Sequence, residues 1–216
     1  MTTCYKALRP DGTDFATGTT KPRKGRWLPR IDGDLIMCQR GYHVSDAVAE
    51  TLLGGSWPCK LARVEIPDGE WERQGHKLVV PTYRVVEWLP AWQALGPNGE
   101  DIAALIERAK RLTDTEAQRL YAARSAAEDA AEDAAEDAAE DAAWSAAWSA
   151  AWSAAWSAAV SAARSPARSA AVSAAGEAAG DAAEYAAGAL VVRDLITPKQ
   201  FAILYGPWAT VVEATP

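Results

Sequence analysis

A four-residue unit, Ala-Ala-X-Y, is the feature that most constrains how this chain folds. It occurs seventeen times without a gap between residues 122 and 189, and only one of its alanines is replaced, by Pro166. The X and Y positions change in blocks, first Glu-Asp, then Trp-Ser, then a mixture. Alanine loses no side-chain entropy on entering a helix, so the tract predicts helix. Because it supplies few reactive side chains, we expect the function to depend on what the tract joins and displays.

The repeat predicts one very long helix. Thr113 and Glu116 form a capping box at its start. The pattern then continues to Pro166, whose missing amide hydrogen predicts a kink rather than a hairpin. A continuous helix over residues 113–190 would be roughly 110 Å long at about 1.5 Å per residue.

The expected fold class is α+β: a small mixed N-terminal domain, a very long Ala-rich helix kinked near Pro166, and a short C-terminal docking helix. The expected parts are an α+β domain over 1–92, a linker and short amphipathic helix over 93–112, the repeat helix over 113–190, and a docking segment over 191–216. Local patterns predict strands over 4–8, 35–38, 60–66 and 78–89, and the last of these is broken at Pro81. They also predict helices over 46–53 and 100–111, and Ser45 is the expected N-cap of the first helix. A second capping box at Thr197 predicts a C-terminal helix that ends at Gly206.

Four tryptophans, one in each of four successive repeat units, form a block within the tract: Trp144, Trp148, Trp152 and Trp156. Burying one large apolar side chain is worth about 2–3 kcal/mol, and alanine lets a second helix approach closely. We therefore expect an oligomerisation surface, resembling a coiled coil, and a homo-oligomer. A tolerated spacer and a membrane contact are the alternatives. The five serines between residues 142 and 163 disfavour the membrane.

The Glu-Asp block, residues 128–141, carries eight carboxylates and no basic residue. Along a helix this is one negative charge per about 2.6 Å, which lies between the phosphate spacings of duplex and single-stranded DNA. An acidic nucleic-acid mimic is therefore an alternative to a solvated face that keeps the chain in solution. With six basic and fifteen acidic residues, residues 113–216 carry a net charge of −9, whereas residues 1–112 carry +2.

The sequence lacks the usual signals of several function classes. Met1 is not followed by an apolar signal-peptide core. Cys4, Cys38 and Cys59 are odd in number and lack metal-type spacing, so we expect a reducing cytoplasm and no metal. The chain has no P-loop, no Rossmann glycine pattern and no Ser/His/Asp set, so we expect no cofactor.

Residues 38–44, Cys-Gln-Arg-Gly-Tyr-His-Val, lie between Tyr5-Lys6-Ala7-Leu8 and Lys77-Leu78-Val79-Val80. This arrangement resembles a small uncharacterised domain of phage and bacterial genomes, which pairs a YKGF-like opening with a C-x-x-G-[FY]-H motif and often carries low-complexity repeats downstream. The resemblance covers about residues 4–89. It implies a phage or prophage setting, and hence the host cell cytoplasm, but no activity. The chain departs from the pattern at Ala7 and Leu8 and in its helical type of repeat.

The same region has a weaker resemblance to ADP-ribosyltransferase-like folds. These often show a tyrosine on the first strand, here Tyr5, and a Gly-aromatic-His-x-Ser/Thr segment that leads into a helix, here residues 41–45. The resemblance implies an acidic residue that holds the ribose of NAD, for which Glu87 and Glu65 are the candidates. For His43, a hydrogen-bonded structural role is the alternative to a site role.

Residues 21–30 contain five basic residues and one tryptophan. Such a composition suits contact with a phosphate backbone and a stacked base. An acidic partner surface, such as the acidic block of another copy, and a plain solvated loop are the alternatives. We expect neither nucleic acid nor a membrane as the main partner.

We therefore expect a phage-type, non-enzymatic binding or sequestering protein, whose recognition domain is displayed on an oligomerising helical rod. A host protein or a small nucleotide-like ligand is the expected partner. The alternatives are an ADP-ribosyltransferase-like enzyme, an acidic nucleic-acid mimic and a structural spacer. The expected ligand-binding residues are Tyr5, Lys6, Tyr42, His43, Ser45 and Arg63.

Changing Trp144, Trp148, Trp152 and Trp156 together to alanine tests the tryptophan surface. Helicity should stay the same or rise, because alanine is the better helix former. The assembly should dissociate, because roughly 8–12 kcal/mol of potential apolar burial per chain is lost. Sedimentation of both proteins measures the change. A monomer before and after the substitution would identify the tract as a spacer.

Overall fold

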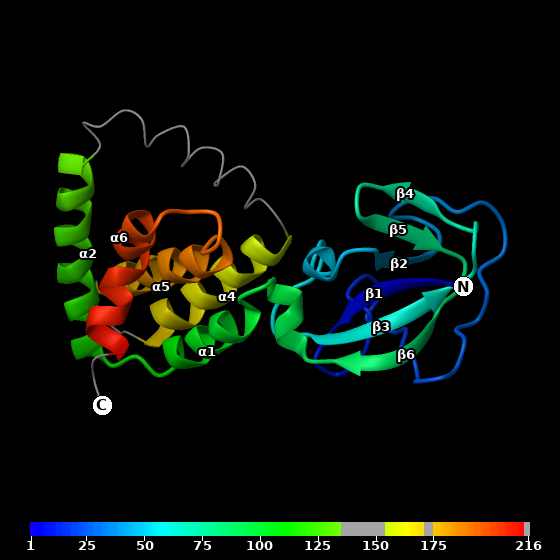
Figure 1. Cartoon of the computed structure of the whole chain (residues 1–216). Helices are drawn as coiled ribbons and strands as arrows, with labels where there is room; N and C mark the ends of the chain where they lie inside the picture. Colours follow the sequence, from blue (N-terminus) through cyan, green and yellow to red (C-terminus); the bar gives the residue numbers. More distant parts are fainter. Residues whose placement is uncertain (135–153, 171–174, 214–216) are drawn as a thin grey trace. The chain divides into compact units, whose positions relative to one another are not determined.

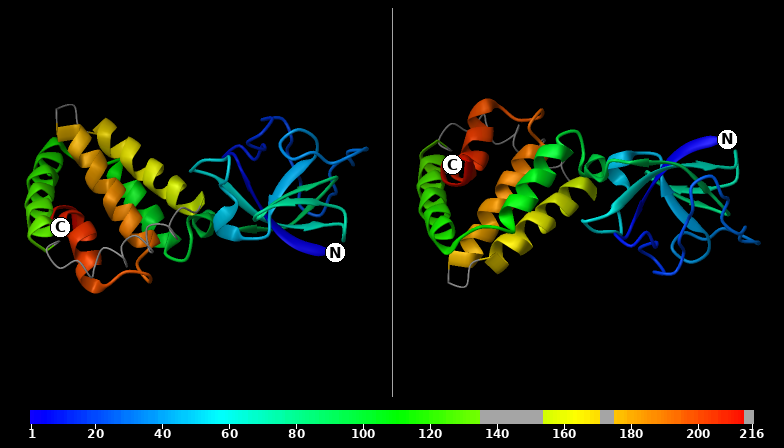
Figure 2. Two further views of the ribbon diagram at one scale, coloured as in Figure 1. Left: turned by 90° about the horizontal axis from the view of Figure 1, so that it is seen from above. Right: turned by 90° about the horizontal axis from the view of Figure 1, so that it is seen from below.

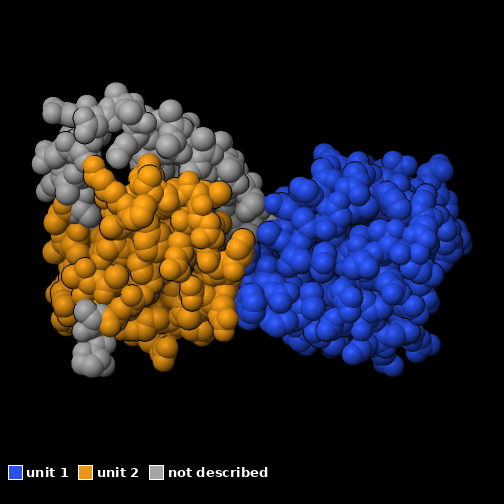
Figure 3. Space-filling model, in the orientation of Figure 1, with its two compact units in different colours: residues 1–96 blue, residues 97–216 orange. Residues whose placement is uncertain are grey.

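The computed structural model describes residues 1–134, 154–170 and 175–213 of the chain. The chain divides into two compact units, Met1–Gly96 and Pro97–Pro216 (Figure 3). The first unit is built on a β-sheet, and the second is helical (Figure 1).

The sheet of the first unit has six strands in the order β4-β5-β2-β1-β3-β6. All neighbouring strands are antiparallel. The strands are β1 (Thr2–Leu8), β2 (Tyr42–Ser45), β3 (Lys60–Ile66), β4 (Glu72–Gln74), β5 (Lys77–Val80) and β6 (Arg84–Leu89). Strand β1 therefore lies inside the sheet, between β2 and β3.

Both faces of the sheet are packed. Cys4 pairs with Val64, and both belong to a buried cluster that includes Tyr83. Side chains alternate along a strand, so Ala7 and its partner Leu61 lie on the other face, where both are also buried. Two short 3-10 helices, η1 (Val48–Glu50) and η2 (Ala91–Leu95), contact each other, and η2 contacts β3. The first unit thus has its own apolar core.

The sequence predictions for this unit are confirmed in part. The strands over 4–8 and 60–66 are present, and 78–89 forms two strands on either side of Pro81. The strand over 35–38 is wrong, because Ile36 there only forms an isolated bridge across a turn. The helix over 46–53 is also wrong. The Ser45 hydroxyl bonds to the backbone of Ala47, two residues on, and only a single 3-10 turn follows.

The second unit consists of packed helices: α1 (Gly99–Ala109), α2 (Asp114–Ala134), α4 (Ala154–Ala170), α5 (Ala175–Val191), α6 (Pro198–Trp208) and a terminal π-helical turn, η3 (Ala209–Glu213). Helix α5 contacts α1, α2, α4 and α6, and α1 contacts α4. Helices α4 and α5 run side by side in both views of Figure 2.

The predicted continuous helix over 113–190 is wrong. Within the described residues the repeat forms separate helices that pack on one another, and the longest, α2, has 21 residues. The reason is the small side chain of alanine. Ala159, Ala163 and Ala167 are spaced four residues apart, which places them on one helix face, and all three are fully buried. Faces this small let two helices of one chain approach closely, so the repeat folds back on itself.

Two further features of the repeat are seen at α4. Helix α4 continues through Pro166 to Ala170, so the chain does not turn back at that residue. The side chain of Arg164 forms ion pairs with Asp181 at 3.0 Å and Glu184 at 2.7 Å, both on α5. The X and Y positions of the repeat therefore join α4 to α5.

The predicted helix caps are confirmed. The Thr113 amide donates to the Glu116 carboxylate at 2.8 Å, and the Glu116 amide donates to the Thr113 hydroxyl at 3.2 Å. The Thr197 box has the same reciprocal pattern. Helix α6 continues past Gly206, however, so the predicted end there is wrong. Its buried Trp208 lies in the same unit, where α6 packs on α5 and α2.

The amphipathic helix predicted over 100–111 corresponds to α1, and its apolar residues Ile102, Leu105 and Ile106 are buried. The predicted oligomerisation residues Trp144, Trp148 and Trp152 lie outside the described residues, and Trp156 falls within α4. Self-association through this block stays a prediction. Among the described residues, no helix is both long and apolar enough to cross a membrane.

Gly41, which precedes β2, offers a test of the packing between β2 and β5. Its φ is 127°, and a Cβ there would lie 2.3 Å from Cγ2 of Val79. Gly41→Ala should therefore lower the free energy of unfolding by about 3 kcal/mol, through backbone strain and the clash together. Gly25→Ala is the matched control, because its φ is 76° but no atom lies within 4 Å of the added Cβ. It should cost only about 1 kcal/mol in urea unfolding. Equal losses would contradict the clash.

Candidate functional site

The first unit contains a small pocket at the junction of β1, β2, β5 and the η1 turn. Its volume is about 30 Å³, close to the share of liquid volume of one water molecule, so it suits an end group of a ligand rather than a whole one. Polar side chains dominate its lining: Tyr5, Lys6, His43, Ser45, Glu50 and Lys77. Four of the six ligand-binding residues predicted from the sequence therefore meet here.

Sheet register explains why Tyr5, His43, Ser45 and Lys77 meet. Ser45 on β2 pairs with Tyr5 on β1 and with Lys77 on β5. Partners directly opposite each other have neighbouring side chains on one face. His43 lies two residues before Ser45 and so shares that face. Lys6 follows Tyr5 on β1 and pairs with Ala62, so its side chain leaves the strand toward the opposite face. The pocket is therefore fixed by three adjacent strands.

The other two predicted residues lie elsewhere in the unit. The Tyr42 hydroxyl donates to the carbonyl oxygen of Pro29 at 3.0 Å, and its ring packs edge-on against Tyr83. Arg63 forms an ion pair with Glu87 at 2.7 Å, which joins β3 to β6. Neither side chain lines the pocket.

Lys6 brings a positive charge into a half-buried environment. The pKa of its ammonium is lowered to about 8, mainly by burial; the negative charge of Asp14 opposes this shift and the positive charge of Lys77 contributes to it. Asp14 accepts hydrogen bonds from Thr17 and Thr20. In the part of the chain that the structure describes, no hydrogen bond or ion pair reaches the Lys6 ammonium. Its charge is compensated only through space.

His43 is held in its neutral form. Burial, together with the positive charges of Lys77 and Lys6, lowers the pKa of its imidazole to about 4. Its Nε2 accepts a hydrogen bond from the backbone amide of Cys38 at 3.0 Å. Cys38 has a positive φ of 62°, and its Sγ accepts from the Lys77 ammonium at 3.4 Å. His43 therefore fixes the turn before β2, in line with the structural alternative for this residue.

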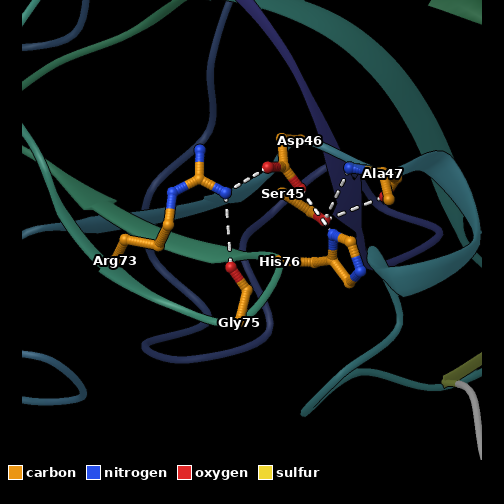
Figure 4. Close-up of polar contacts among 6 residues, drawn as sticks. All are labelled: Ser45, Asp46, Ala47, Arg73, Gly75 and His76. Atoms are coloured by element: carbon orange, nitrogen blue, oxygen red, sulfur yellow. Dashed lines mark hydrogen bonds and ion pairs between the residues drawn. The ribbon is translucent and has the colours of Figure 1, made fainter.

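A second polar cluster lies next to the pocket (Figure 4). Nδ1 of His76 lies 2.9 Å from the Asp46 carboxylate, which also pairs with Arg73. An aspartate that orients a histidine is one half of a catalytic triad. The neighbouring Ser45 hydroxyl, however, donates to the carbonyl oxygen of Ala47, so the imidazole does not activate it. The cluster ties β2 to the β4–β5 turn and has no nucleophile.

The acids named for an ADP-ribosyltransferase reaction are both in ion pairs. Glu87 pairs with Arg63, and Glu65 pairs with Arg84 at 2.6 Å. Neither acid lines the pocket. Among the described residues, no cluster of histidine, cysteine or carboxylate side chains has the arrangement of a metal site.

Comparison of the chain with known protein families, with curated proteins and with solved structures finds no match. The resemblance to a small phage and bacterial domain therefore stays a prediction.

Sequence reasoning missed five lining residues, of which Lys77 and Glu50 carry charge. Lys77 reaches the pocket because β5 pairs with β2, more than thirty positions earlier in the chain. A pairing over such a distance has no local signal. Glu50 was expected in a regular helix and lies in the 3-10 turn instead.

The hydrogen bond between Cys38 and His43 predicts a pH dependence of stability. The pKa of His43 is about 4 in the folded chain, against the ordinary 6.5. Between pH 4 and pH 6.5 the unfolded chain binds more protons than the folded chain. The free energy of unfolding should therefore fall as the pH is lowered from 6.5 to 4. Because the imidazole is partly exposed, we expect a loss on the order of 2 kcal/mol.

Urea unfolding at pH 7, 5.5 and 4.5 measures this loss. His43→Gln should flatten the dependence in this window, because an amide oxygen still accepts the Cys38 amide hydrogen and does not titrate. His76→Gln, which removes the chain's other histidine, is the matched control, and the fall in stability should persist in it. The same slope in His43→Gln and in the unsubstituted protein would rule out His43 as its source.

Proposed function

We propose that this protein is a non-enzymatic binding protein whose N-terminal unit recognises an anionic end group, a carboxylate or a phosphate, at the pocket formed by Lys6, His43, Ser45 and Lys77. The observation that supports this most is that two lysines, Lys6 and Lys77, line one pocket, and that no hydrogen bond or ion pair within the described residues reaches the half-buried Lys6 ammonium. Partial removal of a charge from water without a partner is costly. A bound anion would supply that partner.

The hydrogen-bond donors around the pocket agree with an anion. Because Nε2 of His43 accepts a hydrogen bond and the ring is neutral, its proton lies on Nδ1, which makes that nitrogen a donor. The hydroxyl of Tyr5 and the ammonium of Lys77 are further donors in the lining. Charge-assisted hydrogen bonds of this kind are about twice as strong as neutral ones.

Glu50 limits the class of ligand. Its carboxyl group lines the same pocket, so the pocket is not uniformly positive. An anion is favoured at the lysine side, and a hydrogen-bond donor such as a hydroxyl is favoured near Glu50. A hydroxy acid or a sugar phosphate has both groups. This class includes the nucleotide-like ligand expected from the sequence.

Binding is favoured over catalysis because the reactive groups are already engaged. Nε2 of His43 accepts a backbone hydrogen bond, and the Ser45 hydroxyl donates to a backbone oxygen. The three cysteines are free thiols, which suits the reducing cytoplasm of a host cell. Sequestration of a small metabolite or capture of a host protein would both use such a pocket.

Lys6→Met tests the pocket with two independent measurements. Calorimetric titration with inorganic phosphate and with glycolate should show binding to the unsubstituted protein and a loss of about tenfold or more in the variant. The variant should also be more stable, by about 1 kcal/mol in urea unfolding at pH 7, because a half-buried charge is replaced by an apolar chain of similar length. Weaker anion binding together with higher stability is the result expected for a residue that is retained for ligand binding although it destabilises the fold.

Lys60→Met is the matched control, because Lys60 is an exposed lysine at the start of β3 in the same unit. It should change neither binding nor stability. Lys77→Met should weaken binding as Lys6→Met does. Absence of binding to the unsubstituted protein at 20 mM of either anion, or equal losses in Lys6→Met and Lys60→Met, would contradict the proposal.

A further inference from the structure

The helical unit contains a larger cavity, of about 450 Å³, between α1, α5, α6 and η3. This volume lies in the range of small-molecule sites, about 300–1,000 Å³. Its floor is apolar and made of buried side chains: Leu105, Leu190, Trp208 and Val212. A ligand that covers this floor gains the free energy of apolar burial.

Two aromatic rings form one wall of this cavity. Phe201 and Tyr205 lie one turn apart on α6, and their rings stack with centroids 5.0 Å apart and planes inclined by 21°. The Tyr205 hydroxyl is held by Glu213. An aromatic wall above an apolar floor favours a ligand with a planar apolar body.

The charged groups at the rim differ in how firmly they are held. Glu213 accepts from Tyr205, and Arg108 pairs with Glu116 of the helix cap. Arg193 has a looser contact. Its guanidinium lies 3.5 Å from the Asp101 carboxylate, and the two side chains are 52% and 57% exposed. Exposed pairs of this kind contribute little, so the guanidinium of Arg193 is free to exchange its partner.

The position of Arg193 links its charge to the aromatic wall. The guanidinium carbon lies 5.7 Å from the centroid of the Phe201 ring, so a carboxylate bound to Arg193 would lie beside that wall. A planar guanidinium binds a carboxylate through two parallel hydrogen bonds. Asp101 has a separate favourable interaction, since it lies in the first turn of α1, and it would be released.

We propose that this cavity binds a small amphiphilic carboxylate with a planar aromatic body. The ring lies on the apolar floor against Phe201 and Tyr205, and the carboxylate replaces Asp101 as the partner of Arg193. The site belongs to the helical unit and does not depend on the function proposed for the first unit.

The test uses three probes that share one ring system and differ in charge: 2-naphthoate, 2-naphthylmethanol and 2-naphthylmethylamine. They are titrated into the full-length protein, with calorimetry and ligand-observed NMR as readouts. We expect the acid to bind at least about tenfold more tightly than the alcohol, which corresponds to one charge-assisted contact. We expect the amine to bind most weakly.

Two variants of the lining, Arg193→Met and Ala104→Phe, locate the site, and a third variant serves as the control. Arg193→Met should reduce the affinity for the acid to that for the alcohol and leave the alcohol unchanged. Arg119→Met, at an exposed arginine on α2 outside the cavity lining, is the matched control and should change neither. Ala104→Phe adds a ring at an exposed position of the lining and should abolish binding of all three probes. Circular dichroism and thermal unfolding establish that each variant is folded.

The proposal is overturned if the alcohol binds as tightly as the acid, or if the amine binds most tightly. Equal losses in Arg193→Met and Arg119→Met would also overturn it, as would the absence of binding of the acid at 5 mM. Unchanged binding in a folded Ala104→Phe variant would place the probes outside the cavity and contradict the assignment.

Discussion

Strand β1 carries a charged residue through the centre of a sheet that is packed on both faces, and the first unit depends on this constraint. Its neighbours Cys4, Ala7 and Leu8 are almost fully buried, and Lys6 itself is half-buried. The structure compensates in part through the charge of Asp14, held in a loop by threonine hydrogen bonds. Burial, together with the nearby positive charge of Lys77, lowers the pKa of His43 as well as that of Lys6.

The helical unit depends on a different property, the small volume of alanine. A repeat that supplies two alanines in every four residues offers a close-packing face wherever a helix forms. Such a face does not distinguish a partner in another chain from one in its own. The partner within the chain is always present at high effective concentration, so folding back is favoured for the described helices. Arg164 then links α4 to α5 through Asp181 and Glu184.

Some signals that act within a few residues were read correctly from the sequence, whereas the strand over 35–38, the helix over 46–53 and the helix end at Gly206 were not. The two capping boxes, at Thr113 and Thr197, and the alternating strand over 60–66 are present as predicted. Long-range packing was not read correctly, because the repeat is consistent with both an extended rod and a folded bundle. The candidate site shows the same limit. The motif around His43 identified part of the pocket, whereas Lys77 joins it only through the pairing of β5 with β2.

The two candidate sites share one physical character that separates them from the rest of the surface. Arg63, Arg84 and Arg164 each have a carboxylate within 3.0 Å, and each joins two elements of the fold. Lys6 has no such contact, and that of Arg193 is 3.5 Å long and exposed, yet both lie beside apolar surface. A cation kept next to apolar surface with a weak partner contributes little to folding. It does leave a charge that a ligand can neutralise, so these two residues, rather than the paired arginines, mark the two candidate sites.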